Sequence, residues 1–422
     1  MFKSITLRSD FTKNVLTLMS GTVIAQAIPI AIAPILTRIY TPDDFGVFAL
    51  FFAILSIFSV VMNLRYENAI MLPKNEDEAL FIFIVGFLIN TTISLILFVV
   101  VLLFNESITE LLGDRRIAFY LYFIPLTLFF VGLFNLLTLF NNRQKNYKDI
   151  AQATVLKSVV MGVVQVGIGL LKSGAIGLIS GQILSAFFAN LRLFKNIYQK
   201  EHFKKSFNFK KIVAIAKRYR QFPLFSLPSA LINVLANHLT NILISSFFSV
   251  ATLGFYSLVQ RMLGIPSALI GQSIGQVFYE EGVRLKHQKG EITELFNHTL
   301  KKLIFIGFPL FFALFWSVKP LFILIFGEKW AVAGEYAQIV IPMFFIRFVV
   351  TALSIVYDMF SELKVELLWQ IVLLSGSILL IVLSSSFEVE FKNFLISLSV
   401  FISIMQLISL FIIKQISYGV FR

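Results

Sequence analysis

Leu80 to Phe104, LFIFIVGFLINTTISLILFVVVLLF, is a run of 25 residues without a charged side chain. A helix needs about 20 apolar residues to cross the hydrocarbon core of a bilayer, so this run is long enough to span a membrane. The rest of the sequence resembles it in composition: the 422 residues are 58% hydrophobic and 14% charged, with mean hydropathy +0.85. A soluble domain is about 45–50% apolar, so the composition excludes a water-soluble protein.

Apolar runs of this kind recur along the whole chain, separated by charged or turn-forming residues. They predict an all-α membrane protein with twelve transmembrane helices. We expect these helices at residues 15–37, 45–63, 80–104, 118–140, 153–171, 174–194, 222–247, 253–278, 303–326, 336–357, 366–386 and 394–413.

The 36 lysine and arginine residues outnumber the 23 acids and give a formal net charge of +13. If the N-terminus is cytoplasmic, the inner segments hold several-fold more of these cations than the outer segments, as the positive-inside rule requires. We therefore expect both termini in the cytoplasm and contacts with anionic membrane lipids, and no nucleic-acid partner. The chain has no cysteine, which excludes a disulfide framework, a thiolate nucleophile and a cysteine metal site.

The most basic segment lies near the middle of the chain, where ten basic residues and the single acid Glu201 fall between Arg192 and Arg220. Within it, Phe209, Ile212 and the residues that follow alternate with lysines at helical spacing, as in a helix on a membrane surface. The sequence leaves open whether this segment is an ordinary linker against anionic lipid or holds a specific headgroup site.

A weak internal repeat supports two halves. A shift of 208 residues aligns Phe45–Leu50 with Leu253–Leu258, and Leu112–Asp114 is echoed by Phe326–Glu328. We expect two six-helix lobes related by a pseudo-two-fold axis along the membrane normal. The predicted parts are an N-terminal lobe over residues 1–194, a basic cytoplasmic linker with an amphipathic helix over 195–220, and a C-terminal lobe over 221–422.

Five segments follow one another along the chain in a familiar order. They are Ser20-Gly21 through Gln26, LTRIYTPDDFG from Leu36 to Gly46, LRYENAI from Leu64 to Ile70, FPLFSLPS from Phe222 to Ser229, and FGEKW from Phe326 to Trp330 followed by Gly334. Together they resemble Wzx-like polysaccharide flippases, which belong to the multidrug/oligosaccharidyl-lipid/polysaccharide exporter superfamily.

The resemblance implies a transporter of the bacterial inner membrane that works by alternating access between two lobes. Its cargo would be an undecaprenyl-pyrophosphate-linked oligosaccharide repeat unit, moved from the cytoplasmic to the periplasmic leaflet for O-antigen, lipopolysaccharide, capsule or exopolysaccharide synthesis. The resemblance implies neither an enzyme reaction nor a cofactor, and it implies other glycan-assembly membrane proteins as partners. It leaves coupling to an H+ or Na+ gradient open.

Other functions fit less well. A multidrug/cation antiporter of the same superfamily is expected to hold a carboxylate deep in a helix, whereas the acids here lie in loops or near the ends of the runs. A membrane-embedded glycan polymerase or ligase needs positioned acids or bases and a sizeable outer loop, and neither is evident. A peptidoglycan-precursor flippase is expected to carry two more helices.

The site residues are predicted from the cost of polar groups in hydrocarbon, because the family has no sharp catalytic motif. Arg347 lies near the centre of its run, where a cation costs about 2.5–3.5 kcal/mol to insert. We expect it to face a cavity and bind the pyrophosphate or acidic sugars of the cargo. The alternative is a structural arginine bonded to helix-end carbonyls or to a neighbouring acid.

Two further helices carry polar stripes. Arg261 shares a face with Gln272 and Gln276 on the predicted eighth helix, which Gly264, Pro266, Gly271 and Gly275 make breakable. Asn233, Asn237 and Asn241 repeat every four residues on the seventh helix, beside His238. We expect these stripes to meet cavity water or sugar hydroxyls, with interhelical hydrogen bonding as the alternative.

The remaining candidates are weaker. His238 is a candidate for proton coupling or a structural histidine. Gln26 is a polar residue within the first run. Arg38, Arg65 and Lys157 lie nearer helix ends, where their side chains can reach the interface without any role in binding. No metal site is predicted.

Overall fold

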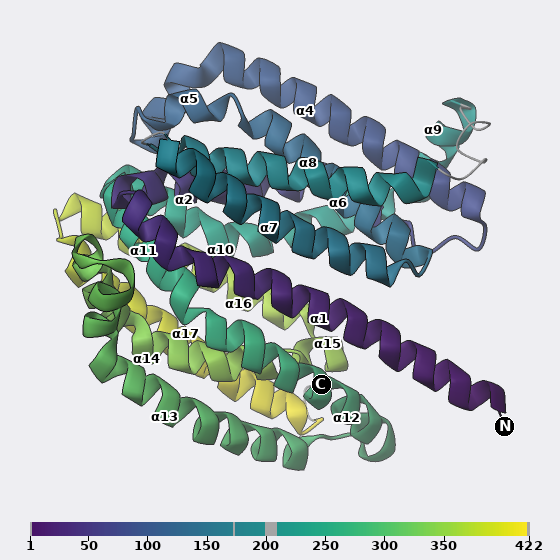
Figure 1. Cartoon of the computed structure of the whole chain (residues 1–422). Coiled ribbons are helices and arrows are strands. Elements are labelled where there is room, and N and C mark those ends of the chain that lie inside the picture. The colour runs from purple at the N-terminus through teal and green to yellow at the C-terminus, as the bar shows by residue number, and fades with distance from the viewer. Residues whose placement is uncertain (1, 172–173, 199–208, 420–422) are drawn as a thin grey trace. The chain divides into compact units, whose positions relative to one another are not determined.

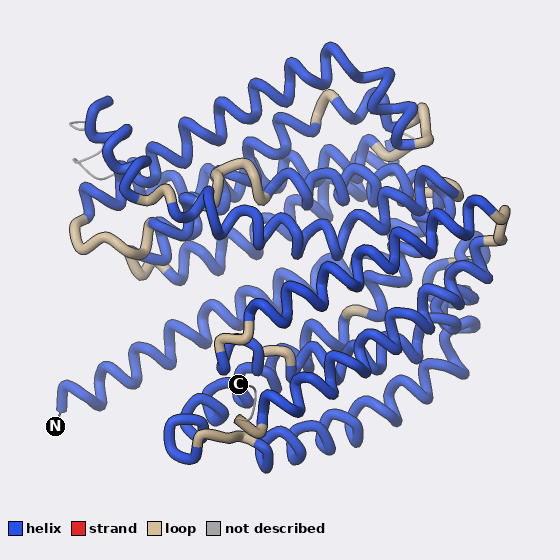
Figure 2. Tube along the Cα trace, turned by 180° about the vertical axis from the view of Figure 1, so that it is seen from behind, coloured by secondary structure: helices blue, strands red, loops and turns tan. Residues whose placement is uncertain are grey.

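The computed structural model describes residues 2–171, 174–198 and 209–419. Every regular element in these ranges is helical (Figure 2). Eleven of the described helices are long and apolar enough to cross a membrane, so the chain is a multi-pass membrane protein. The predicted helix over 253–278 is the one that does not form a continuous span, because the chain there is divided into three shorter pieces.

The chain separates into two compact units, residues 1–238 and 239–422. The elements of the first unit are α1 (Phe2–Ile39), α2 (Pro42–Ser59), α3 (Tyr66–Ala69), α4 (Glu76–Leu112), α5 (Ile117–Leu121), α6 (Ile124–Arg143), α7 (Tyr147–Leu171), α8 (Ile176–Tyr198), α9 (Phe209–Arg218) and the π-helical turn η2 (Phe222–Ser226).

Helix α10 (Leu227–Phe247) contains the boundary between the units, which falls after His238. The second unit continues with α11 (Val250–Leu263), the π-helical turn η3 (Ser267–Gly271), α12 (Gln272–Lys289), α13 (Thr293–Phe326), the 3-10 turn η4 (Glu328–Trp330), α14 (Ala331–Leu353), α15 (Val356–Phe360), α16 (Leu363–Ser386) and α17 (Phe391–Ser417). The twelve-helix count, the two-fold axis and the lobe boundaries stay predictions.

The third helix of each predicted half is longer than its apolar run. Helix α4 begins with three acids, Glu76, Asp77 and Glu78. They favour a helix N-terminus because their negative charges are attracted to the positive end of the helix macrodipole. It ends at Gly113, whose φ of 78° is the left-handed conformation that closes many helices. The sequence prediction began within the apolar run, whereas the helix begins earlier, in its charged first turn. The predicted end at Phe104 coincides with a kink, where φ is −119° and ψ is 18°, and helical structure resumes beyond it up to Leu112.

In the first unit, α7 packs along α1 and α8, and α6 packs between α4 and α8 (Figure 1). Three buried asparagines bind the backbone of α6. The Nδ2 atoms of Asn63, Asn90 and Asn190 donate to the carbonyl oxygens of Gly132, Phe129 and Phe130 at 2.8–2.9 Å. These amides fix α6 to three separate parts of the unit.

In the second unit, α14 is the central helix and packs against α11, α13 and α17. Its aromatic residues interlock with those of α13: the Phe311 ring lies 5.9 Å from the rings of both Phe345 and Phe348. Arg347 therefore stands on the helix that holds this unit together.

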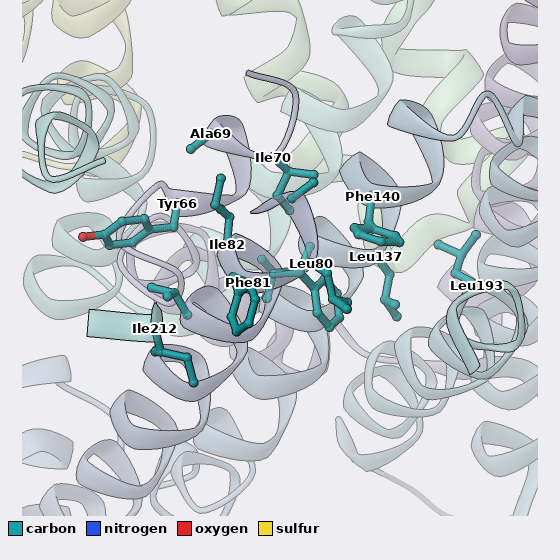
Figure 3. Packing of buried hydrophobic residues seen from close by; sticks show 14 of the residues in the cluster. Tyr66, Ala69, Ile70, Leu80, Phe81, Ile82, Leu137, Phe140, Leu193 and Ile212 are labelled. Carbon is teal, nitrogen blue, oxygen red and sulfur yellow. The ribbon is translucent and has the colours of Figure 1, made fainter. Parts of the chain in front are cut away.

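The predicted amphipathic helix of the linker is present as α9. Residues 199–208 of the linker lie outside the described residues. Ile212 of α9 is buried in a cluster with Phe81 and other residues of α3, α4 and α6 (Figure 3). The helix thus packs on the first unit with one of its faces.

Candidate functional site

Arg347 is half-buried on α14, between apolar neighbours and six residues before the helix ends at Leu353. Helix α14 is continuous at this point, and most of its residues there are apolar. The guanidinium of Arg347 therefore needs polar groups close to its own position on the helix. It interacts electrostatically with Tyr256 of α11. The described residues place no acid within ion-pair distance of Arg347.

Tyr256 is almost fully buried beside Arg347 and is hydrogen-bonded by the side chain of Gln260, one turn along α11. Its ring also lies 6.3 Å from that of Phe391 on α17. Tyr256 therefore lies close enough to Arg347 for their charges to interact. Sequence reasoning missed this residue because a tyrosine in an apolar run is most simply an anchor or a core residue.

Arg261 lies half-buried in the last turn of α11, just before the break in the predicted eighth helix. The break is the one that the glycines and proline predict, and it consists of Gly264 and the π-helical turn η3. The Ser267 hydroxyl of η3 is buried and has no hydrogen-bond partner among the described residues. Broken helices of this kind commonly occur at transporter binding sites.

Helix α12 and η3 run close to α14 near Arg347. A β-carbon at Gly271 would lie 3.8 Å from the carbonyl oxygen of Phe348, and one at Gly275 would lie 3.3 Å from that of Ala352. Gln276, the next residue, is exposed. Gln272 begins α12, but its side chain lies outside the described residues, so its predicted role stays a prediction.

The asparagine face of α10 is present. Asn233 and Asn237 are exposed, and the Asn237 Nδ2 donates to the Asn233 backbone oxygen at 2.8 Å. Asn241 is half-buried, and its Oδ1 has no partner among the described residues. At the Asn241 end of this face, one amide oxygen thus accepts no hydrogen bond from the described residues.

His238 is half-buried on α10, and its ring meets the edge of Phe52 on α2 at 6.2 Å. Its Nδ1 is buried and accepts or donates no hydrogen bond among the described residues. The contact with Phe52 fixes the imidazole by packing, which fits the structural alternative as well as proton coupling.

The other predicted residues lie in the first unit. Gln26 is half-buried on α1, Arg38 is exposed in the last turn of α1, and the Lys157 ammonium of α7 lies 4.7 Å from the centre of the Phe134 ring. The cation–π contact gives Lys157 a structural role of its own.

Arg65 is half-buried, and its φ of 64° is unusual for an arginine. Its Nη1 lies 3.5 Å from Oε1 of Glu67, so the local pair expected from the sequence is present. Glu67 is buried, and this burial raises its pKa despite the nearby guanidinium. Arg65 thus has an acid within its own segment, but its Nε and the Glu67 Oε2 are buried without a hydrogen-bond partner among the described residues.

The structure places Arg261, Arg347, Asn241 and Gln276 in the second unit, together with the backbone of Gln272. It places Gln26, Arg38, Arg65, Lys157, Asn233, Asn237 and His238 in the first unit. Arg347 is brought next to α11, the helix of Arg261, and next to η3 and α12. The described residues contain no group of three acids or histidines placed to hold a metal ion.

Several cations near helix ends have an acid beside them. Arg143 Nε lies 3.1 Å from Glu76, Arg192 Nη2 lies 3.2 Å from Asp149, and Lys319 Nζ lies 3.1 Å from Glu335. Arg347 differs from these because no acid in the described ranges lies within ion-pair distance of it. A guanidinium with this surrounding can bind a phosphate or carboxylate in a bidentate manner.

The chain matches the family described as "Polysaccharide biosynthesis protein" over residues 35–335. It is 22% identical over 306 residues to the succinoglycan biosynthesis transport protein ExoT of Rhizobium meliloti, a match covering 71% of this chain and 59% of ExoT. It is 34% identical over 118 residues to the teichuronic acid biosynthesis protein TuaB of Bacillus subtilis, covering 28% of this chain and 24% of TuaB. The matches thus span less than two thirds of these relatives' own lengths.

Solved structures share the fold. The lipid II flippase MurJ in an inward closed conformation matches with TM-score 0.71 and 13% identity, over 94% of this chain and 86% of MurJ. A multidrug resistance MATE family transporter of the MOP superfamily, facing inward, matches with TM-score 0.69 and 11% identity, over 95% of this chain and 98% of that one. The resemblance found in the sequence is confirmed: the chain has the fold of MOP superfamily transporters and belongs to the polysaccharide biosynthesis protein family.

Proposed function

We propose that this chain is a flippase that moves polyprenyl-pyrophosphate-linked oligosaccharides across the bacterial inner membrane, from the cytoplasmic to the periplasmic leaflet. The family and the fold support a transporter for polysaccharide synthesis. The observation that carries the choice of cargo is Arg347, a mid-helix cation without an acidic partner among the described residues. The cost of placing a cation in this position is offset if an anionic group of the cargo binds there.

The other polar residues take supporting roles in this proposal. Tyr256 donates its hydroxyl to the same anionic group or holds the guanidinium in place, and Arg261 adds a second positive charge beside the break of the eighth helix. Asn233, Asn237, Asn241 and Gln276 provide amides for sugar hydroxyls. The cargo crosses without a bond being made or broken, so no catalytic residue is assigned.

A drug/cation antiporter is the closest rival, and the described acids argue against it. Glu335 lies in the first turns of α14 beside Lys319, and Glu366 lies in the first turn of α16. Neither lies in the middle of a spanning helix, where a carboxylate would bind a cationic drug. The coupling ion stays open, and an imposed H+ or Na+ gradient across reconstituted vesicles would identify it.

The test is translocation of a purified lipid-linked glycan in vesicles, detected by a glycan-modifying reagent added outside. We expect Arg347→Ala to slow translocation at least about tenfold, because a hydrogen bond to a charged group contributes about 1.5–3 kcal/mol. Arg38→Ala removes an exposed arginine at a helix end and serves as the matched control, expected to work at the wild-type rate. A folded Arg347→Ala protein that moves cargo at the wild-type rate would contradict the proposal.

A further inference from the structure

Helix α12 and the turn η3 that precedes it pack along α14 and α15 of the second unit (Figure 1). Three buried glycines form the contact: Gly271, Gly275 and Gly282. A β-carbon at these positions would lie 3.8 Å from the Phe348 carbonyl oxygen, 3.3 Å from that of Ala352 and 2.7 Å from the Met359 sulfur, respectively. Both series advance by four and then seven residues, a spacing that keeps residues on one helical face. The two segments therefore run parallel and in register.

These contacts fix the distance between the two segments better than they fix the register. Glycine lets two backbones approach closely, and it presents no side chain that would interlock with the neighbouring helix. Packed helices can slide past one another by small amounts. A directional bond at one end of the contact is therefore needed to hold the register.

Lys286 of α12 makes such a bond. It lies one turn beyond Gly282, on the same face of the helix. Its Nζ donates to the Met359 carbonyl oxygen at 2.6 Å and lies 4.8 Å from the centre of the Phe360 ring. That carbonyl belongs to the last turn of α15, where a helix offers no backbone N–H of its own. Two successive turns of α12 thus contact Met359, one at its side chain and one at its carbonyl oxygen.

The neighbouring cations of α12 bond elsewhere. Arg284 Nη2 lies 3.4 Å from Oε1 of Glu281 on the same helix, and Lys289 Nζ lies 3.9 Å from Oε2 of Glu294 on α13. Lys286 differs from them because its partner lies on α15, which directly follows α14.

We propose that Lys286 is a positioning residue: it fixes the register of α12 on α14 and α15, and thereby the place of η3 beside Arg347. The register that sets the end of α12 against α15 also sets Gly271 of η3 against Phe348, the residue after Arg347. A shift at the Lys286 end therefore displaces η3 as well, because α12 is a continuous helix between them. The inference rests on the proposed function only in giving Arg347 a cargo to bind, and the register itself is measured without cargo.

The chain contains no cysteine, so two spin labels can be placed in the full-length protein. Val277→Cys of α12 and Val332→Cys of α14 put them at exposed positions, separated by about 30 Å of helix rise along α14. Double electron–electron resonance should give one narrow distance in the parent. Lys286→Met should shift or broaden this distance by at least about 3 Å, the rise of two helical residues.

The controls separate the bond from the side chain's other properties. Lys286→Arg should keep the parent distance, because a guanidinium also donates hydrogen bonds and stacks on aromatic rings. Lys289→Met removes an exposed lysine of the same helix and should keep it too. Lys286→Gln, shorter and neutral, tests the same contact if Lys286→Met does not fold. An unchanged distance in the folded variant at Lys286, or an equal change in Lys289→Met, would overturn the proposal.

Binding of a polyprenyl-pyrophosphate-linked glycan then tests whether Lys286 acts through Arg347. Lys286→Met should weaken binding at least about threefold, since a small displacement of a binding group is costly. It should cause no further loss in the Arg347→Ala background. The same loss in both backgrounds would overturn the positioning role. If Arg347→Ala binds the glycan as wild type does, the proposed function fails, while the distance measurement still decides whether Lys286 fixes the register.

Discussion

The second helix of each repeat begins in the same way and ends differently. Thr41 caps α2 and Ser249 caps α11, separated by the 208 residues of the sequence repeat. Each hydroxyl accepts a hydrogen bond from the backbone N–H three residues later. Both helices then lose their regular α form, after Ser59 in the first unit and at Gly264 in the second.

The two interruptions differ in what lies beside their arginine side chains. In the first unit, Asn63 is bonded to Gly132 of α6 and Arg65 is paired with Glu67. In the second unit, the Ser267 hydroxyl has no partner among the described residues, and Arg347 on the adjacent α14 is accompanied by Tyr256 rather than an acid. Both breaks keep buried polar atoms without a hydrogen-bond partner among the described residues: Asn63 Oδ1, Arg65 Nε and Glu67 Oε2 in the first, and Ser267 Oγ in the second. The comparison teaches that the arginine of the first break has an acid beside it, whereas no described acid lies within ion-pair distance of Arg347 beside the second.

The largest expected effect is on Arg347. Arg347→Glu should abolish translocation of a lipid-linked glycan, because it replaces attraction for the pyrophosphate with repulsion. Arg347→Lys should retain part of the activity, since it keeps the charge and loses the bidentate geometry. Vesicle translocation assays compare the rates of wild type, Arg347→Lys and Arg347→Glu. An active Arg347→Glu protein would contradict the difference between the two units that is described above.

The packing of the first interruption against α6 can be tested at Gly132. A β-carbon there would overlap the Asn90 Oδ1 and press on Met62, next to the hydrogen bond from Asn63. Gly132→Ala should therefore destabilise the protein by about 1–3 kcal/mol, as overpacking does. Thermal unfolding of the purified protein measures the loss.

Gly167→Ala is the matched control for this test. It lies within α7, and a β-carbon there would meet no atom within 4 Å. Because alanine also favours a helix over glycine, Gly167→Ala should leave the unfolding midpoint unchanged or raise it slightly. Equal losses of stability in Gly132→Ala and Gly167→Ala would show that the contacts around Gly132 do not stabilise the first interruption.

The two caps allow a quantitative comparison of the halves. Thr41→Ala and Ser249→Ala should each cost about 1 kcal/mol of stability. The loss should be larger for Thr41, because Asp44 also accepts a hydrogen bond from the Thr41 N–H at 2.9 Å and completes a capping box. A larger loss at Ser249 in the same thermal unfolding assay would contradict this order.

The smallest effect concerns Glu67. Its folded-state pKa is raised by burial, so the ionised carboxylate is disfavoured in the fold, and stability falls as the pH rises through that pKa. Glu67→Gln should therefore unfold at a slightly higher temperature than wild type at neutral pH. The difference should vanish at about pH 3, below the ordinary glutamate pKa, where the carboxyl is protonated in both states. A lower midpoint at neutral pH would mean that the pair with Arg65 outweighs burial.

The sequence predicted the helical segments well because a bilayer imposes a minimum apolar length, and Leu80–Phe104 has no other stable form in hydrocarbon. It marked the eighth helix as breakable at Gly264 and Pro266 but predicted one continuous span over 253–278, which the structure divides into α11, η3 and α12. Helix ends were less accurate, because the charged first turn of α4 is helical although it is not apolar.

The site could be predicted only in part. Arg347 lies in the middle of an apolar run, where inserting a cation into the membrane costs free energy. This cost identified it as a candidate site residue. Its neighbour Tyr256 lies 91 residues away in sequence, and helical spacing relates residues on one helix but says nothing of the helix packed beside it. The hydrogen bonds of Asn63 and Asn90 to α6 were missed for the same reason, since each is a lone asparagine in an apolar run.

The central claim is that Arg347 receives an anionic group of the cargo. Its most direct test is equilibrium binding of a polyprenyl-pyrophosphate-linked glycan to the purified full chain, compared between wild type and Arg347→Ala. The account predicts at least about tenfold weaker binding to the variant, together with a smaller difference when the glycan carrier bears one phosphate instead of two. Equal affinity of a correctly folded Arg347→Ala protein for the pyrophosphate-linked glycan would contradict it.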